Sequence, residues 1–393
     1  MTTRKSNPYL ALANSYTMDS PQPSSMNYWW NVGSLLGLCL VMQMASGLFT
    51  AMHFSSNMEL AFNSVEHMMR DVNSGWLMRY MHANGASFFF VAMYLHMGKA
   101  LYYGSYKKPR ELVWSMGVMM FILTMATAFM GYCIVYGQMS HWGATVMTNT
   151  LSAMPFMGND IVPFIWGGFS VSNPTIQRFF ALHFLLPFML AALVIMHLMA
   201  LHMHGSSNPV GMTGNLDRIP MSCYFLFKDM MTTFMFTLMF SLFVFFSPNT
   251  LGHSDNYMPG NPMVTPASMV PEWYLLPFYA ILRSMPDKLG GVMAMFSAIL
   301  MLLMLPMTDR SVMRGNTFKV LSKLSFYLFV FNFLLLGNLG QLHVEVPFIV
   351  TGQFATVYYF SYFIILVPVI STMENMLFYM GNKTKYIHMR KML

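Results

Sequence analysis

Four histidines stand in two apolar stretches of the chain at a repeated spacing. His82 and His96 lie in one stretch, His183 and His197 lie in another, and each pair is separated by 14 residues. On an α-helix, 14 residues rise about 21 Å and stop about 40° short of four full turns, so each pair shares one helix face at two depths. Ligand-type side chains inside apolar spans are costly and usually functional. The spacing therefore predicts two sites, one above the other, each made of two imidazoles from different helices.

A site of two imidazoles favours a haem over other metal groups. Two axial imidazoles close a haem iron to external ligands and suit it to electron transfer, whereas zinc would require about four ligands at each site. The alternative is that each histidine makes a hydrogen bond between helices, which accounts for one histidine but not for the repeated spacing. Because one span separates the two stretches, they run in the same direction. We therefore expect His82 to pair with His183, and His96 with His197.

Glycines recur with the same period in two neighbouring stretches. Each pair is 14 residues apart, and the pairs are Gly33 with Gly47 and Gly117 with Gly131. A helix without Cβ atoms lets a flat macrocycle approach its backbone, although glycines at such a spacing alone more often serve helix packing. The match to the histidine period predicts that these glycines face the haems. Arg79 and Lys99, at opposite ends of the second span, could neutralise haem propionates or extend to the membrane interface, and the two roles are compatible.

The composition indicates that the histidines and glycines stand on membrane-spanning helices. Of the 393 residues, 56% are apolar and 9% are charged, whereas about 25% charged residues are usual in a soluble domain. These figures exclude a soluble domain, a disordered chain, a coiled coil and a nucleic-acid-binding protein. Crossing a bilayer takes roughly 20 helical residues, and backbone groups in lipid must be satisfied within the helix. Eight uncharged runs meet this need, at 31–58, 80–98, 112–159, 179–216, 230–254, 289–308, 324–344 and 346–373.

We therefore expect an all-α integral membrane protein with eight transmembrane helices, of which the first four form the haem-binding bundle. The N-terminal haem-binding region would cover 1–210, and a C-terminal region of four further spans would cover 211–393. The run 112–159 becomes polar after about residue 136, which predicts a surface hairpin rather than a further span. The segment 256–271 contains four prolines and cannot be a regular helix, so we expect a long loop there.

The distribution of lysine and arginine predicts the orientation in the membrane. An even number of spans places both termini on one side. Sixteen of the 21 Lys and Arg residues fall on that side and five on the opposite side, so the termini are predicted on the electrically negative side. The three cysteines, Cys39, Cys133 and Cys223, are far apart and form no CxxC motif. They therefore indicate no disulfide framework, zinc site or covalent haem attachment.

Several short motifs accompany the paired histidines. They are Gly137-Gln-Met-Ser-His-Trp-Gly143, the Asn-Pro-Thr of 173–175, Asn215-Leu-Asp-Arg-Ile-Pro220 and Pro271-Glu-Trp-Tyr274. Together they resemble the mitochondrial cytochrome b family of the cytochrome bc1 complex (respiratory complex III), most closely its yeast-type fungal members, over roughly residues 5–380. The resemblance implies two non-covalent b-type haems, a low-potential one at His82 and His183 and a high-potential one at His96 and His197. It also implies a mitochondrial inner membrane protein with both termini on the matrix side.

The same resemblance implies a quinol-oxidising pocket on the positive side. Glu272 stands at the membrane margin, where desolvation raises the pKa of a carboxyl group and suits it to accept a quinol proton. A lone interfacial glutamate could instead cap a helix or be solvated, and the flanking motif favours the functional interpretation. Four further residues match the lining positions of the family's pocket, namely Phe129, Tyr132, Gly143 and Tyr279.

A quinone-reducing pocket is implied on the negative side. His202 lies five residues beyond His197, rotated by about 140° and about 7.5 Å nearer that surface, so it cannot ligate the same iron. In the family, residues matching His202 and Asp229 bond the quinone ring oxygens, with Lys228 beside them. Asn31 and Ser206 are further candidates for this pocket. The alternative for all of them is an ordinary polar residue at the membrane boundary.

These features predict an electron-transfer subunit of ubiquinol–cytochrome c reductase. Ubiquinol would be oxidised on the positive side and ubiquinone reduced on the negative side, with proton translocation by a Q cycle. The resemblance implies a homodimeric complex in a lipid bilayer, with a Rieske iron–sulfur protein, cytochrome c1 and other complex III subunits as partners. One alternative is a di-haem membrane anchor of another respiratory enzyme. Another is a secondary transporter, which would show an inverted repeat and helices broken at the midplane, and the sequence shows neither.

Overall fold

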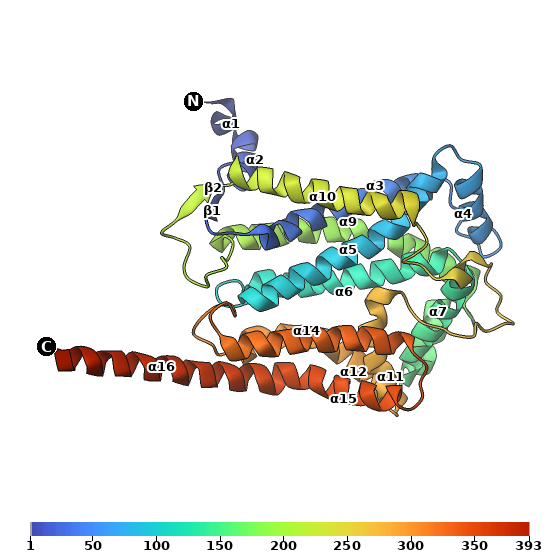
Figure 1. Ribbon diagram of the computed structural model, residues 1–393. Helices are drawn as coiled ribbons and strands as arrows, with labels where there is room; N and C mark the ends of the chain where they lie inside the picture. The colour runs from blue at the N-terminus through green and yellow to red at the C-terminus, as the bar shows by residue number, and fades with distance from the viewer. Residues whose placement is uncertain (1, 393) are drawn as a thin grey trace.

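Long apolar helices make up most of the protein (Figure 1). The computed structural model describes residues 2–392, with side chains as far as Gly381. The helices up to the middle of the chain are α1 (Thr3–Ser6), α2 (Pro8–Thr17), α3 (Val32–Ala51), α4 (Ala61–Arg70), α5 (Gly75–Tyr103), α6 (Glu111–Ile134), α7 (Gln138–Asn149), α8 (Gly158–Trp166) and α9 (Asn173–His204). The later helices are α10 (Tyr224–Phe246), α11 (Leu276–Ser284), α12 (Lys288–Leu300), α13 (Leu305–Thr308), α14 (Val320–Gln341), α15 (Phe348–Ser361) and α16 (Val367–Met392).

Short helical turns connect or extend these helices. The 3₁₀ turns are η1 (Tyr28–Asn31), η2 (Thr150–Ala153), η3 (Ser254–Tyr257), η4 (Trp273–Leu275) and η5 (Met301–Met304), and η6 (Tyr362–Leu366) is a π-helical turn. The turn η5 joins α12 to α13 in one apolar segment, Lys288–Thr308, and η6 joins α15 to α16.

Seven helical segments of the described chain are long and apolar enough to cross a membrane. They begin with η1 and α3 and continue through α6, α9, α10, the α12–α13 segment, α14 and the α15–α16 segment. The helix α5 has 29 residues and packs against α3, but it is less apolar because it carries Arg79, Asn84 and Lys99 as well as two histidines. With α5, the architecture agrees with the predicted all-helical membrane protein of about eight spans.

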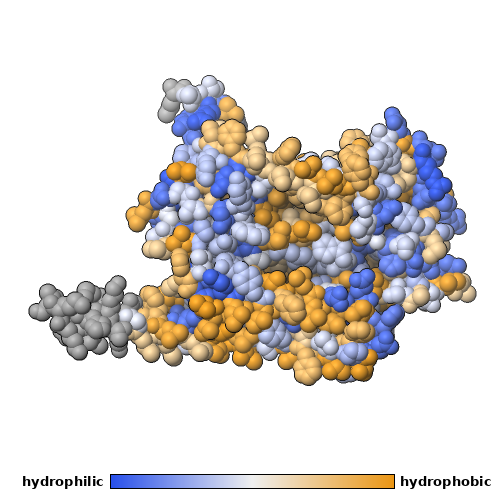
Figure 2. Space-filling model, in the orientation of Figure 1, coloured by the Kyte–Doolittle hydropathy of each residue, from blue (hydrophilic) through white to orange (hydrophobic). Residues whose placement is uncertain are grey.

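The outer surface fits a multi-pass membrane protein. Figure 2 shows many apolar residues on the visible face and most of the strongly hydrophilic residues toward the two ends of the bundle. On α10, the exposed large side chains include Phe227, Met230, Phe234, Met235 and Leu238. Side chains of this kind are stable in contact with lipid tails. The first helices and the end of α16 lie at the same end of the bundle (Figure 1), which agrees with an even number of crossings.

The segments expected outside the spans are irregular or short. The helix α6 ends at Ile134, and the polar stretch after it forms the two shorter helices α7 and α8. Between η3 and η4 the chain forms no regular helix, as its prolines predict. Two three-residue strands, β1 (Pro21–Pro23) and β2 (Arg218–Pro220), pair antiparallel with Gln22 opposite Ile219. This pairing could not be predicted from local patterns, because it joins segments far apart in the chain.

Two groups of buried side chains form the interior. The larger one includes Phe90, Phe121, Tyr274 and Tyr359, and it joins α5 and α6 to the helices from α11 onward. The smaller one lies around Cys133, α7 and the start of α9. The helix α10 packs against α3 and α5. The helix α6 contributes side chains to both groups, and the boundary near residue 210 stays a prediction.

Candidate functional site

Two helix pairs position the four histidines. The helix α5 packs along α3, and α9 packs along α6. His82 and His96 lie on α5, and His183 and His197 lie on α9, so the imidazoles project from opposite sides of the bundle interior. The regular rise of each helix keeps the two members of a pair at different depths.

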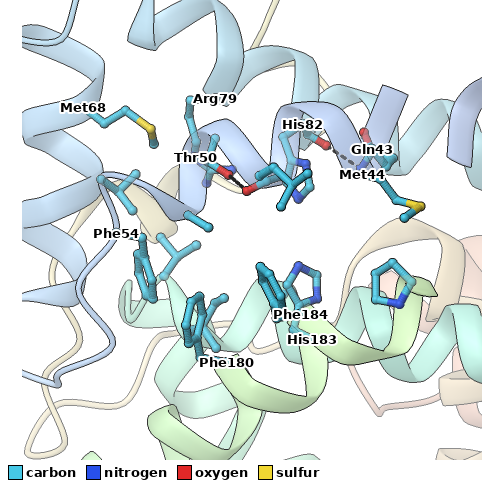
Figure 3. A pocket seen from close by; sticks show the side chains of 18 of the residues that line it. Gln43, Met44, Thr50, Phe54, Met68, Arg79, His82, Phe180, His183 and Phe184 are labelled. Carbon is cyan, nitrogen blue, oxygen red and sulfur yellow. Dashed lines mark hydrogen bonds between the residues drawn. The ribbon is translucent and has the colours of Figure 1, made fainter. Parts of the chain in front are cut away.

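The structure brings His82 and His183 together in one cavity. Their ring centroids are 6.1 Å apart and their ring planes are almost perpendicular, at 88°. Figure 3 shows Arg79 and His82 on one side of this cavity and His183 on the other. Two imidazoles on opposite sides of one metal ion have centroids roughly 6 Å apart, since each metal–nitrogen bond is about 2 Å. The observed separation therefore fits a single iron held between the two rings.

Hydrogen bonds determine which ring nitrogen of His82 and His183 carries the proton and which keeps a free lone pair. Nδ1 of His183 lies 2.8 Å from the Thr127 carbonyl oxygen, which can only accept. Nδ1 of His82 lies 3.1 Å from the Ser46 hydroxyl, and that hydroxyl donates to the Met42 carbonyl. In both rings Nδ1 is therefore the protonated nitrogen, and Nε2 keeps a free lone pair. This is the tautomer that an axial haem ligand needs.

Each of the four predicted glycines faces one of the four imidazoles. An ideal Cβ atom on Gly33 would lie 3.4 Å from His96 Cε1, and one on Gly47 would lie 3.0 Å from His82 Cε1. On the other helix pair, Gly117 faces His197, and a Cβ atom on Gly131 would overlap His183. The repeated glycines thus leave room beside the imidazoles of the neighbouring helix, a relation that the spacing alone did not predict.

The second histidine pair lies toward the other ends of the same helices. His96 and His197 are close enough to interact electrostatically. Nδ1 of His96 is buried and has no hydrogen-bond partner among the described residues, whereas the His197 ring interacts with the backbone of Val113. Nearby, the Lys99 ammonium lies 4.4 Å from the centre of the Trp30 ring. A pair of half-buried imidazoles with a cation beside them suits a haem with acidic propionates.

The donor set fits a haem better than a bare metal ion. In the part of the chain that the structure describes, no three His, Cys, Asp or Glu side chains come close enough together to hold an ion. Two facing imidazoles beside glycine-lined helix faces, with Arg79 at the edge of the first site, are what a bis-histidine macrocycle requires.

A second cavity contains the residues predicted for quinol oxidation. Glu272 lines it, together with all four further candidates, which are Phe129, Tyr132, Gly143 and Tyr279. A Cβ atom on Gly143 would meet no atom within 4 Å, so this residue borders open space. The Tyr279 hydroxyl of α11 donates to the Met269 carbonyl at 3.4 Å and so joins the irregular segment before η4 to that helix.

Glu272 also lines a larger cavity that reaches the first histidine pair. This cavity has a volume of about 220 Å³, and its walls include His82, His183, Arg79 and Tyr132. Burial raises the pKa of the Glu272 carboxyl to about 7, while the hydrogen bond from Tyr132 and the charge of Arg79 act in the opposite direction. At neutral pH such a group exchanges protons readily. A proton-accepting group and the histidine pair thus border the same space.

The residues predicted for the quinone-reducing pocket on the negative side form two groups. Near the start of α3, Asn31 donates to the Thr232 hydroxyl at 3.3 Å, and Asp229 interacts with the Ser34 hydroxyl. Lys228 donates to the Met26 carbonyl at 2.9 Å.

His202 instead stacks on Tyr16 of α2, with ring centroids 4.1 Å apart. Arg110 donates to the Ser206 carbonyl at 3.2 Å. Among the described residues, no hydrogen bond or ring contact joins His202 to Asp229. The quinone-reducing pocket therefore stays a prediction.

Sequence reasoning missed the groups that orient the first histidine pair. Ser46 and Thr127 hydrogen-bond the two rings, and Gln43 donates to the His82 carbonyl at 2.9 Å. A polar residue inside an apolar span is a usable signal for Ser46 and Gln43. No sequence signal exists for Thr127, because only its backbone oxygen takes part.

Comparison with known families and proteins gives a consistent result. Residues 17–205 match the family described as "Cytochrome b/b6/petB", and residues 259–360 match "Cytochrome b(C-terminal)/b6/petD". The chain is 85% identical over 383 residues to cytochrome b of Debaryomyces hansenii, covering 98% of this chain and 100% of that protein. It is 79% identical over 385 residues to cytochrome b of Candida albicans, with coverages of 98% and 100%. It is also similar to a solved "Hyperthermophilic respiratory Complex III" chain, with a TM-score of 0.88 and 30% identity over 94% of this chain and 98% of that one.

Proposed function

Because this chain belongs to the cytochrome b family, we propose that it oxidises ubiquinol on one side of the membrane and reduces ubiquinone on the other, as a catalytic subunit of complex III. Family membership makes it an electron-transfer subunit with b-type haems. The observation that carries the finer proposal is that Glu272 and the His82–His183 pair line one continuous cavity. A proton acceptor and an electron acceptor then serve the same bound quinol.

Four imidazoles would hold the two haems. His82 with His183 would ligate the low-potential haem, and His96 with His197 the high-potential haem. When bound, these groups carry single electrons across the bilayer. The chain itself contributes fixed Nε2 lone pairs, glycine-lined space, and cations for the propionates from Arg79 and Lys99.

At the positive side, the residues would bind a quinol and take its protons. Phe129, Tyr279 and Gly143 shape an apolar cavity for the ring. The Glu272 carboxylate accepts a proton from a quinol hydroxyl, and its pKa of about 7 suits that transfer near neutral pH. The quinol would give up two electrons. One would leave to an iron–sulfur partner, since the three separated cysteines of this chain form no cluster motif, and the other would pass to the His82–His183 site.

At the negative side, titratable side chains would deliver protons to a reduced quinone. His202 and Asp229 are the proposed proton donors, Lys228 supplies a positive charge, and Asn31 and Ser206 are further contacts. Uptake of protons here and release near Glu272 would separate charge across the membrane. Each side would draw residues from both predicted regions, the haem-binding region 1–210 and the C-terminal region 211–393. Both termini would lie on the matrix side of the mitochondrial inner membrane.

The proposed partners are a Rieske iron–sulfur protein, cytochrome c1 and the other subunits of a homodimeric complex III. The similarity to a chain from a respiratory complex III supports this assembly.

Spectroscopy and inhibition test the proposal together. A reduced-minus-oxidised spectrum of the purified complex should show two b-type signals, and a ligand of the quinol-oxidising cavity should stop electron entry from the positive side. A di-haem anchor of another enzyme would show both signals without that inhibition. A transporter would show neither haem signal.

A further inference from the structure

The segment that carries Glu272 has little secondary structure of its own. Residues 265–272 lie in no helix or strand, and η4 that follows is three residues long. Among the described residues, the backbone of Glu272 makes one local hydrogen bond, in which its carbonyl accepts from the Leu275 N–H at 2.9 Å. A proton-accepting side chain needs a fixed position relative to its substrate. Contacts from elsewhere must therefore hold this segment.

Three residues on one face of α5 contact the segment directly. The Tyr94 hydroxyl donates to the Tyr274 carbonyl. The Phe90 ring stacks on the Tyr274 ring, with centroids 4.0 Å apart and planes 2° from parallel. The Ser87 hydroxyl accepts a hydrogen bond of 3.0 Å from the Trp273 indole nitrogen. The spacing of three and four residues puts Ser87, Phe90 and Tyr94 in one row along the helix.

Most of the side chains in these contacts are buried, and neighbouring helices pack against them. Ser87 is 3% exposed, Phe90 is 1% exposed, and Tyr274 is 4% exposed. The Tyr94 ring also makes edge contacts with Phe121 of α6 and Phe333 of α14. The stacked rings of Phe90 and Tyr274 are almost fully buried. Displacing the segment would therefore break contacts that water could not readily replace.

The row of Ser87, Phe90 and Tyr94 lies near the charged and polar groups that surround the Glu272 carboxylate. Arg79, eleven residues before Phe90 on α5, points to the same side of the helix and interacts with Glu272 electrostatically. Tyr132 of α6 hydrogen-bonds the carboxylate, and Tyr274 of η4 lies near enough to be affected by its charge. The helix that presents His82 therefore also fixes the segment that presents Glu272.

We propose that Ser87, Phe90 and Tyr94, the α5 clamp, are positioning residues that hold Glu272 in place for quinol oxidation. They act through Trp273 and Tyr274. Tyr94, whose hydroxyl the test removes, is not among the residues that line the two cavities at Glu272. The inference rests on the proposed function, because it assigns the clamp to the proton acceptor of that reaction.

A double-mutant cycle in the assembled complex tests the clamp. Tyr94→Phe removes the hydroxyl but keeps the ring, and leaves the Tyr274 carbonyl without its donor. We expect the kcat of quinol oxidation to fall roughly threefold to tenfold, from the loss of one buried hydrogen bond, with little change in KM and unchanged haem spectra. In a Glu272→Gln background, Tyr94→Phe should have almost no further effect, since the group that it positions is gone.

The matched control is Tyr359→Phe of α15, which removes a buried tyrosine hydroxyl bonded to the Ala298 carbonyl at 2.8 Å. Tyr359 lies near enough to Tyr94 to interact with it electrostatically, but its hydroxyl bonds α12 and not the segment of Glu272, so the control separates loss of a neighbouring hydroxyl from loss of the clamp contact. It should leave kcat unchanged. If Tyr94→Phe resembles this control, or lowers kcat equally in both backgrounds, the clamp is overturned. If Glu272→Gln itself does not slow quinol oxidation, the proposed role of Glu272 fails first and the clamp falls with it. Should Tyr94→Phe not assemble, Ser87→Ala removes the Trp273 contact and enters the same cycle with the same expected and overturning results.

Discussion

Replacing Gly131 by alanine should release the haem from the His82–His183 site. An ideal Cβ atom at this position would overlap His183 Cε1 and would lie 2.8 Å from Nδ1 and 2.9 Å from Nε2. The ring cannot simply move away, because its Nδ1 is bound to the Thr127 carbonyl at 2.8 Å. Overpacking of a tight site costs about 1–3 kcal/mol. That free energy corresponds to a loss of about 5–150-fold in haem affinity at this site.

The other three glycines provide a graded comparison. The nearest approach of an added Cβ atom to the facing imidazole is 3.0 Å at Gly47, 3.4 Å at Gly33 and 3.6 Å at Gly117. The last distance is an ordinary van der Waals contact. Without a clash, Gly→Ala inside a helix is favourable by roughly 0.5–1 kcal/mol. Gly117→Ala should therefore retain its haem fully, and the losses should increase from Gly33 through Gly47 to Gly131.

Redox titration of the purified complex measures this series, because the two haems are expected to titrate at different potentials. For Gly131→Ala, one of the two components should shrink or shift while the other stays. Equal haem content in all four alanine variants would show that the glycines serve only helix packing. A larger loss in Gly117→Ala than in Gly131→Ala would contradict the reasoning from the Cβ distances.

Four further substitutions test the remaining assignments. His183→Leu should remove the haem shared with His82 and leave one bis-histidine signal, and two unchanged signals in a folded variant would mean that the pairing is wrong. Glu272→Gln should slow quinol oxidation by about 10²–10⁴-fold. Because the pKa of this carboxyl is about 7, it is protonated and inactive as a base below that pH, so the wild-type rate should rise through neutral pH and the variant rate should not. Asp229→Leu should slow quinone reduction while haem reduction from the opposite side continues in stopped-flow traces; if both acidic variants impair the same half-reaction, the two-sided assignment fails. Gly143→Ala should not lower thermal stability, because the residue lies inside α7 and its Cβ atom meets no described atom within 4 Å, yet it should raise the KM for quinol by narrowing the cavity, and an unchanged KM would place the quinol elsewhere.

The histidine pairing could be predicted because it depends only on helix geometry. A fixed rise per residue and the direction of the spans place His82 at the depth of His183, and the structure brings the two rings within 6.1 Å. The lining of the Glu272 cavity came from the family resemblance, and the cavity contains the expected residues. Local signals were likewise sufficient for the end of α6 and for the proline-rich loop.

Contacts between distant segments could not be predicted. The glycines were expected to face haems, but their closest neighbours are imidazoles of the adjacent helix, which depends on how the helices pack. The same holds for the Thr127 carbonyl beside His183 and for the pairing of β1 with β2. The stacking of Phe90 on Tyr274 joins residues that are 184 positions apart, and no local sequence pattern near either residue predicts it.

One helix, α5, links the two halves of the proposed quinol chemistry. It presents His82 to the histidine pair and Arg79 to the shared cavity, and its next turns hold the segment of Glu272. Electron transfer and proton transfer from one quinol require both acceptors at fixed distances from the same ring. If the two acceptors stood on separately moving elements, each displacement would favour one transfer over the other. The 29-residue helix α5 carries His82 itself and holds the segment of Glu272 through the α5 clamp. A substitution in the clamp should therefore disturb proton acceptance while the histidine pair, anchored by Ser46 and Thr127, stays in place.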